Sequence, residues 1–355
     1  MKTALADVNT PAVLVDLGLT RRNIDRFQAY ADKHGLKVRP HIKTHKLPAI
    51  AEMQLDAGAI GITCQKVSEA EAMIAGSDRI KDVLITYNIL GNEKLAHLAA
   101  LAKKVTLSVV ADSAKVIDGL SAAFAEEDKP LTVLVECNTG ADRCGVATPE
   151  AAAELAKRIA AAPGLIFGGL MTFPPTGGAR AVQSFMSRAK VFLEAAGIDV
   201  PVITSGGTPS MMKAALAPIA TEYRPGTYVY NDRSLVARGA CAWEDCALTV
   251  LATVVSVPAA NRAIIDAGSK TLTSDLFGQT GFGHVLGRPD IAIDQLSEEH
   301  GRLVTTGPIA LSVGDRVRVV PNHACVVTNM VDAVHIVEGD TVTDIWPVAA
   351  RGKIT

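Results

Sequence analysis

The chain has 355 residues, of which 48% are apolar, 4% aromatic and 20% charged, with 29 glycines and 17 prolines. This composition excludes a disordered, collagen-like or coiled-coil protein, and the length allows two average domains or one large barrel. The net charge of -2 excludes a global basic field that would hold nucleic acid or an anionic membrane.

The N-terminal segment carries Asp7 and Asn9 where a signal peptide would need an uninterrupted apolar core. The most apolar stretch, residues 247–260, is shorter than the roughly 20 residues of a membrane helix, and its Val and Thr content favours a buried strand. We therefore expect a cytoplasmic protein without membrane or nucleic-acid partners. Six cysteines without a CxxC pair predict neither a disulfide framework nor a zinc ribbon.

Short β-rich runs alternate with amphipathic helical stretches between residues 36 and 230. The runs begin near Leu36, Ile60, Val83, Val105, Leu131, Ile166, Val200 and Thr221. The segments between them, such as TPEAAAELAKRIAAA, have helix formers, capping residues and helical apolar spacing. Eight parallel strands with helical crossovers predict an α/β fold built on a (β/α)8 barrel of the TIM type.

The character of the sequence changes after about residue 238. The runs CALTVLATVVSV, RAIIDAG, DRVRVVPNHACVVTNM and AVHIVEGDTVTDIWPV are strand-like and have little helical periodicity. They predict an antiparallel β domain over residues 239–355, after a barrel domain over residues 1–238. The first strand-like run, AVLVDL, precedes a helical stretch over residues 19–34 and could pair with either domain.

Cationic residues cluster after the first predicted barrel strand, in RPHIKTHK. Strand alternation would place Arg39, His41, Lys43 and His45 on one face. Cationic neighbours and desolvation lower the pKa of a lysine and give the neutral amine that a Schiff base requires. A solvated loop and a simple anion site are the alternatives at this position.

The ends of the seventh and eighth predicted strands favour phosphate binding. SGGTP, residues 205–209, offers backbone N–H groups, a hydroxyl and a helix start, and RPGTY, residues 224–228, adds a second glycine and threonine. A lysine on the first strand and a phosphate site opposite it predict pyridoxal phosphate (PLP) as the cofactor.

His323 and Cys325 lie two positions apart in PNHACVV. In a strand, both side chains would emerge on one face and could share a metal ion. A thiolate and an imidazole favour zinc over manganese or magnesium, and two protein ligands leave positions open for substrate. The alternative is a core cysteine beside a histidine at a strand start.

The segments TPAVLVD, RPHIKTHK, CQKVSEAE, DRCGV, SGGTP, RPGTYVYND and PNHAC carry a resemblance over essentially the whole chain. In them the chain resembles the D-threonine aldolase and D-serine dehydratase family of fold type III PLP enzymes. The resemblance implies an alanine racemase-like barrel, a C-terminal β domain and a head-to-tail homodimer that acts on a small-molecule substrate.

The resemblance also implies site residues. Lys43 would carry PLP as a Schiff base, Arg143 would approach the pyridine ring, and His323 and Cys325 would hold the metal, with His323 also catalytic. The expected phosphate ligands are Ser205, Gly206, Gly207, Gly226 and Thr227, and the further expected ring or phosphate contacts are Gln65, Thr172 and Tyr228.

The implied activity is that of a lyase which cleaves D-3-hydroxy amino acids such as D-threonine into glycine and an aldehyde. The His-x-Cys pair is similar to the dehydratase branch of the family, whereas MTFPPT and GFGHVLG resemble D-threonine aldolases. The alternative is therefore a dehydratase that converts D-serine, D-threonine or 3-hydroxy-D-aspartate into a 2-oxo acid and ammonia. A racemase is less favoured, because no tyrosine of the β domain offers a base on the opposite face of the cofactor. A non-catalytic PLP carrier is also less favoured, because it would need neither the β domain nor the His-x-Cys pair.

Overall fold

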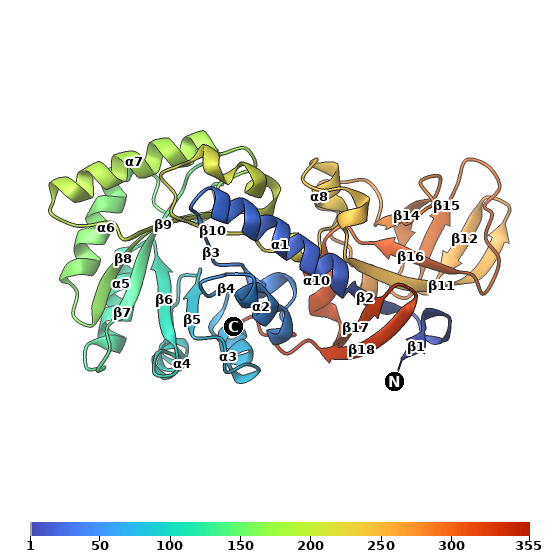
Figure 1. Cartoon of the computed structure of the whole chain (residues 1–355), viewed down its shortest axis with the longest axis horizontal. Coiled ribbons are helices and arrows are strands. Elements are labelled where there is room, and N and C mark those ends of the chain that lie inside the picture. Colours follow the sequence, from blue (N-terminus) through green and yellow to red (C-terminus); the bar gives the residue numbers. More distant parts are fainter. Residues whose placement is uncertain (1) are drawn as a thin grey trace. The chain divides into compact units, whose positions relative to one another are not determined.

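The computed structural model describes residues 2–355 and divides the chain into two compact units (Figure 1). The barrel unit comprises Arg26–Lys43, Pro48–Gly226 and Lys353–Thr355, and the β unit comprises the chain up to Asp25, Thr44–Leu47 and Thr227–Gly352. Helix α1 (Leu17–Lys33) contributes residues to both. The division after residue 226 differs from the sequence-based boundary at residue 238.

The barrel unit contains the eight strands that the sequence predicts. They are β3 (Lys37–Val38), β4 (Ile62–Cys64), β5 (Asp82–Ile85), β6 (Thr106–Ala111), β7 (Leu131–Cys137), β8 (Leu165–Thr172), β9 (Val202–Gly206) and β10 (Glu222–Arg224). They form one parallel sheet in the order β3-β10-β9-β8-β7-β6-β5-β4. A parallel bridge between His41 and Thr63 joins the two ends of this order. The (β/α)8 prediction is thus confirmed.

Helices lie outside the barrel sheet (Figure 1). They are α2 (Pro48–Asp56), α3 (Val67–Ala75), α4 (Asn92–Ala102), α5 (Ala114–Phe124), α6 (Pro149–Ala161) and α7 (Ala179–Ala195), and a 3-10 helix (Thr208–Leu216) links β9 to β10. Helix α6 shows how the sequence sets a helix start: Thr148 accepts a hydrogen bond from the backbone N–H of Ala151, and Pro149 occupies the first turn.

The side chains of five neighbouring strands fill the barrel interior. Leu84, Val110, Leu134 and Met171 are buried together, and Val202 packs against them. Each comes from a different strand, β5 to β9, which is the layered packing expected of a barrel core. The polar strand ends are therefore carried by a solid apolar core.

The β unit is built on a ten-stranded sheet. Its strands are β1 (Thr3–Ala4), β2 (Ala12–Asp16), β11 (Leu248–Ala259), β12 (Arg262–Ile265), β13 (His284–Val285), β14 (Ala292–Leu296), β15 (Gly301–Val304), β16 (Arg316–Val320), β17 (Ala333–Glu338) and β18 (Thr341–Pro347). The long strand β11 pairs antiparallel with β2, β12 and β16, whereas β2 pairs parallel with β17. The run AVLVDL, which forms β2, therefore belongs to this unit. Its parallel pairing with β17 departs from the antiparallel pattern that the sequence predicts.

Three short helices complete the β unit: α8 (Arg233–Ala237), α9 (Ser269–Leu272) and α10 (Ala324–Met330). Helix α10 replaces the end of the strand that was expected to run through PNHACVV, and that expectation is wrong. Within residues 2–355, no helix has the length and apolar character that crossing a bilayer requires.

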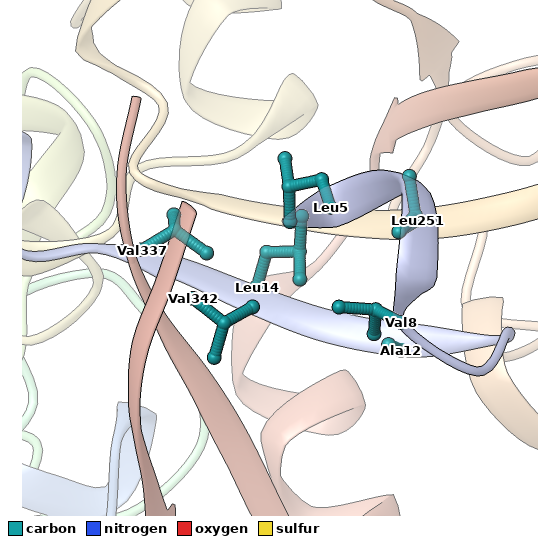
Figure 2. Close-up of a cluster of buried hydrophobic side chains, with 7 residues drawn as sticks. All are labelled: Leu5, Val8, Ala12, Leu14, Leu251, Val337 and Val342. Atoms are coloured by element: carbon teal, nitrogen blue, oxygen red, sulfur yellow. The ribbon is translucent and has the colours of Figure 1, made fainter. Parts of the chain in front are cut away.

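An apolar cluster joins the N-terminal segment to the sheet of the β unit (Figure 2). It consists of Leu5, Val8, Ala12, Leu14, Leu251, Val337 and Val342, all buried. Leu14 is fully buried in β2 between β11 and β17, which explains why AVLVDL reads as a strand with both faces covered.

Candidate active site

Lys43 lies just beyond the first barrel strand. Strand β3 ends at Val38, and Ile42–Thr44 form a 3-10 helix where the sequence predicted a continuing strand. Pro40 interrupts the strand because it has no N–H to donate to a neighbour. Lys43 is half-buried at this end of the barrel.

The cationic residues of RPHIKTHK do not share one face, and the predicted alternation is wrong. Nε of Arg39 lies 3.0 Å from Oε2 of Glu222, and Nη1 lies 2.5 Å from Oδ1 of Asp82, so two carboxylates neutralise this guanidinium. His45 belongs to the β unit. His41 and the lysine are what remains of the predicted cluster in the barrel.

His41 is the centre of a hydrogen-bond chain. Its Nδ1 accepts the backbone N–H of Lys43 at 3.4 Å, and its Nε2 lies 3.0 Å from Oε1 of Gln65. Nε2 of Gln65 donates to the carbonyl of Thr86 at 2.9 Å. Burial, together with the charges of Lys43, Arg224 and Arg143, lowers the pKa of His41 well below 6.5. The imidazole is therefore neutral, and the charges that act on it place three cations at this end of the barrel.

Arg224 on β10 is buried in a polar network at the same end. Its Nε donates to Oγ1 of Thr204 at 2.8 Å, and Nη2 donates to the carbonyl of Thr172 at 2.5 Å. Thr204 donates in turn to Oε1 of Glu222 at 2.7 Å. Burial lowers the pKa of Arg224 to about 10, which still leaves it charged near neutral pH. The network holds the positive charge of Arg224 in a fixed position, where it would attract an anionic ligand.

Arg143 is exposed in the loop after β7 and stacks on Phe173, with its Cζ 4.7 Å from the ring centroid. Its charge acts on Glu136, a buried carboxyl on β7. Burial raises the pKa of Glu136 to about 7, although the guanidinium of Arg143 opposes the rise. The end of β7 and the loop that follows it thus bring a perturbed acid and a cation together.

A group of potential metal ligands lies beside Arg143. A carboxylate oxygen of Asp112, one of Glu136 and Sγ of Cys144 lie within 4.8 Å of one another. Arg143 contacts the cysteine by a side-chain hydrogen bond, and its positive charge opposes a cation at this position. We therefore do not assign a metal to this group.

The residues of the SGGTP turn fit a phosphate group. A Cβ on Gly206 would come within 2.8 Å of the carbonyl oxygen of Arg224, and Gly207 has a φ of +123°, a conformation that strongly favours glycine. Oγ1 of Thr208 accepts the backbone N–H of Gly226 at 3.1 Å and so ties the turn to the loop after β10. Backbone can approach an anion closely at such a turn, as PLP binding needs.

His323 and Cys325 are brought together at the start of α10. His323 is the N-cap residue and Cys325 lies in the first turn, and their side chains are in hydrogen-bond contact. Burial lowers the pKa of His323, but Cys325 and Asp275 outweigh it and raise the pKa to about 9. Burial raises the pKa of the Cys325 thiol, and contact with His323 reverses that effect and lowers it. An imidazole and a thiol in side-chain contact are a pair of donor groups that a zinc ion fits.

Hydroxyl groups and a carboxylate surround this pair. Sγ of Cys325 lies 3.2 Å from Oγ1 of Thr44 and 3.5 Å from Oγ1 of Thr227. Nδ1 of His323 lies 2.7 Å from Oδ2 of Asp275. Both candidate ligands are therefore held in place by neighbouring side chains.

Of three other residues expected in the cofactor site, Thr172 and Tyr228 are buried and Thr227 is half-buried. Oγ1 of Thr172 bonds Oγ1 of Thr139 at 2.8 Å. Thr227 directs its hydroxyl to Cys325, and Tyr228 is fully buried in a 3-10 helix (Thr227–Val229) and not in strand β10. Thr227 therefore contacts the candidate metal ligand Cys325, which the sequence did not predict.

Glu136 and Asp275 are the site residues that the sequence analysis missed. Glu136 is the only charged residue of the apolar strand β7. A single carboxyl in such a strand was the sequence signal that could have identified it. Asp275 lies in a loop 48 positions before His323, and no motif connects the two.

Comparison with known proteins identifies the family. The model of the alanine racemase N-terminal domain matches residues 15–234, and that of a serine dehydratase domain matches residues 247–337. The chain is 36% identical to a D-threonine aldolase from Arthrobacter sp over 98% of this chain and 94% of that one. It is 30% identical to a D-threo-3-hydroxyaspartate dehydratase from Delftia sp. over 98% of both chains.

Solved structures agree. The D-threonine aldolase from Filomicrobium marinum superposes with a TM-score of 0.92 and 34% identity, over 99% of this chain and 98% of that one. The Delftia dehydratase superposes with a TM-score of 0.86 and 30% identity, over 97% and 98%. Two further solved structures are variants of a D-threo-3-hydroxyaspartate dehydratase. One, in the metal-free form, replaces a cysteine by alanine, and the other replaces by alanine a histidine two positions earlier.

The fold and the matches define a fold type III PLP enzyme with an alanine racemase-like barrel. More narrowly, the chain belongs to the D-threonine aldolase and D-serine dehydratase family, and it is a PLP-dependent lyase that acts on a small molecule.

Proposed function

We propose that the chain cleaves D-3-hydroxy amino acids such as D-threonine by a retro-aldol reaction that uses PLP and a divalent metal ion, with zinc favoured. The observation that carries the proposal is the contact between His323 and Cys325 in a chain of this family. Cleavage next to a hydroxyl needs a group that binds the hydroxyl, and an imidazole with a thiolate can hold a metal for that purpose. The similarity to named D-threonine aldolases supports the substrate class.

PLP would supply an electron sink for the bond that breaks at the substrate Cα. Lys43 would hold the cofactor through Nζ and carry a proton to or from Cα. The turn at Gly206 and Gly207 would bind the phosphate, and the cations Arg143 and Arg224 would favour an anionic cofactor and substrate.

A divalent cation would supply a Lewis acid that lowers the pKa of the substrate hydroxyl. His323 and Cys325 would bind this cation. An imidazole that binds the metal through one nitrogen and Asp275 through the other has no free lone pair, so the catalytic role of His323 would be to hold the Lewis acid at the hydroxyl. The hydroxyls of Thr44 and Thr227 lie 3.2 Å and 3.5 Å from Sγ of Cys325, and they would hold the sulfur in place for the metal.

The alternative is a dehydratase, and one observation favours it. The His-x-Cys spacing matches the spacing of the two residues replaced in the solved variants of a D-threo-3-hydroxyaspartate dehydratase. In that reaction Lys43 would remove the Cα proton, and the hydroxyl held at His323 and Cys325 would leave as water. The resulting product would hydrolyse to a 2-oxo acid and ammonia.

Product analysis with D-threonine separates the two reactions. Protein supplemented with PLP and zinc should yield glycine and acetaldehyde if the proposal is correct, and 2-oxobutyrate with ammonia if the chain is a dehydratase. Lys43→Ala and Cys325→Ala should abolish either set of products. Turnover that persists in Lys43→Ala would contradict both.

We also infer a homodimer from the family resemblance. Light scattering of the PLP-loaded protein should give twice the chain mass of 37.1 kDa. A mass of one chain in an active preparation would contradict it.

A further inference from the structure

Asp275 makes a short, directed hydrogen bond to a candidate metal ligand. Its Oδ2 lies 2.7 Å from Nδ1 of His323, and the two side chains are 34% and 20% exposed. A hydrogen on Nδ1 that is donated to a carboxylate leaves Nε2 as the lone-pair nitrogen for a cation. The contact therefore fixes both the tautomer and the direction of the imidazole.

The loop around Asp275 is built to hold that carboxylate in place. Thr273 has a φ of +63° and Phe277 a φ of +48°, and a positive φ is costly for a β-branched residue. Oδ1 of Asp275 accepts the backbone N–H of Phe277 at 3.1 Å, so that only Oδ2 is directed to the histidine. The ring of Phe277 also packs on His323, with centroids 4.6 Å apart.

A second set of bonds ties this loop to the residue before His323. Nδ2 of Asn322 donates to the carbonyls of Gly281 at 2.8 Å and Asp275 at 3.3 Å. Oδ1 of Asn322 accepts from Nη1 of Arg233 at 2.9 Å. Asn322 is only 2% exposed, so this connection is part of the core of the β unit.

We propose that Asp275 is a positioning residue that orients His323 for metal binding, and that the loop from Thr273 to Gly283 holds Asp275 in position. The inference rests on the proposed metal site and adds a residue that binds no metal itself. Loss of such a partner typically weakens metal affinity by about 10- to 100-fold.

The test measures zinc affinity of the PLP-loaded protein by competition with a chromogenic chelator. Asp275→Ala should bind zinc about 10- to 100-fold more weakly than the unaltered chain. Asp275→Asn should fall between the two, because an amide oxygen can accept the hydrogen bond without the charge. Cobalt in place of zinc should show a shifted absorption spectrum in both variants, since the ligand field follows the orientation of the imidazole.

The control is Glu71, whose carboxylate makes the same type of hydrogen bond to a histidine outside the candidate site. Oε1 of Glu71 lies 2.7 Å from Nδ1 of His97 on an exposed surface, so Glu71→Gln matches Asp275→Asn in chemistry and bond length. We expect Glu71→Gln to leave zinc affinity unchanged. Thermal unfolding of the metal-free variants shows whether a loss of affinity reflects a general loss of stability.

The outcomes separate this inference from the proposed function. Zinc affinity that is unchanged in Asp275→Ala but lost in Cys325→Ala overturns the role of Asp275 and leaves the metal site standing. If Asp275→Asn lowers both zinc affinity and the stability of the metal-free protein, the loss of affinity reflects damage to the fold, and the role of Asp275 is also overturned. An unaltered chain that binds no zinc overturns the proposed function together with the inference.

Discussion

Nε2 of His41 lies 3.0 Å from Oε1 of Gln65, and the opposite ring nitrogen accepts the backbone N–H of Lys43. Because Nδ1 is an acceptor, the ring hydrogen must be on Nε2, and the imidazole is neutral. The low pKa of His41, caused mainly by burial, agrees with this tautomer. The residue that would carry the cofactor is thus held through its main chain by an uncharged ring.

Gln65→Glu should disturb this arrangement. A carboxylate next to Nε2 raises the pKa of His41, and a protonated ring has a hydrogen on Nδ1 where the N–H of Lys43 now points. We expect kcat to fall by on the order of 10²-fold, because a small misplacement of a catalytic group has that effect. The pH profile of kcat should gain a new ionisation. Gln295→Glu, on an exposed strand, should change neither, and identical profiles for the two variants would contradict the role of His41.

Periodicity predicted the barrel well because each strand is an apolar run between capped helices. All eight predicted runs contain strands, and the central residues Leu84, Val110 and Leu134 are buried as such runs require. The same signal failed at both candidate sites. At the first site, β3 is only two residues long and ends shortly before Pro40. At the second, His323 is the N-cap of a helix where alternation suggested a strand.

The pairs that matter chemically depend on tertiary contacts that no local pattern encodes. The contact between His323 and Cys325 was predicted from their spacing, and it occurs in a helix start that gives the same proximity by another geometry. Asp275 and Glu136 reach the sites from a loop and from a core strand. Only the fold determines which carboxylates are placed there.

Lys43→Ala should abolish the covalent attachment of PLP. Reduction of the loaded protein with borohydride, followed by peptide mass analysis, should label the peptide that contains Lys43 in the unaltered chain and no peptide in the variant. Lys66→Ala is the control, since Lys66 follows the next barrel strand and its Nζ lies 3.8 Å from the ring centroid of Tyr87. A label on Lys66 instead would reassign the cofactor lysine.

Gly206→Ala should weaken PLP binding and lower the stability of the barrel. The new Cβ would lie 2.8 Å from the carbonyl oxygen of Arg224, so one of the two strands must shift, at a cost of about 1–3 kcal/mol. Gly307→Ala is the control, because nothing lies within 4 Å of its added Cβ and its φ is ordinary. Fluorescence titration with PLP and urea unfolding measure the two effects. Equal PLP affinity in both variants would remove the turn from the cofactor site.

Glu136→Gln should stabilise the cofactor-free protein in a pH-dependent way. The pKa of Glu136 is raised from 4.5 to about 7, chiefly by burial, so the folded chain prefers the protonated carboxyl. This preference favours folding fully below pH 4.5 and is lost as the pH rises through about 7. The difference between the two pKa values corresponds to about 3 kcal/mol.

Gln matches the protonated acid, so the variant and the unaltered chain should have similar free energies of unfolding at low pH and differ by up to about 3 kcal/mol above pH 7. Urea unfolding across this range measures the difference. Glu150→Gln, an exposed substitution, supplies the baseline. A difference that does not change with pH would show that folding leaves the pKa of Glu136 unshifted, with the charge of Arg143 offsetting the effect of burial.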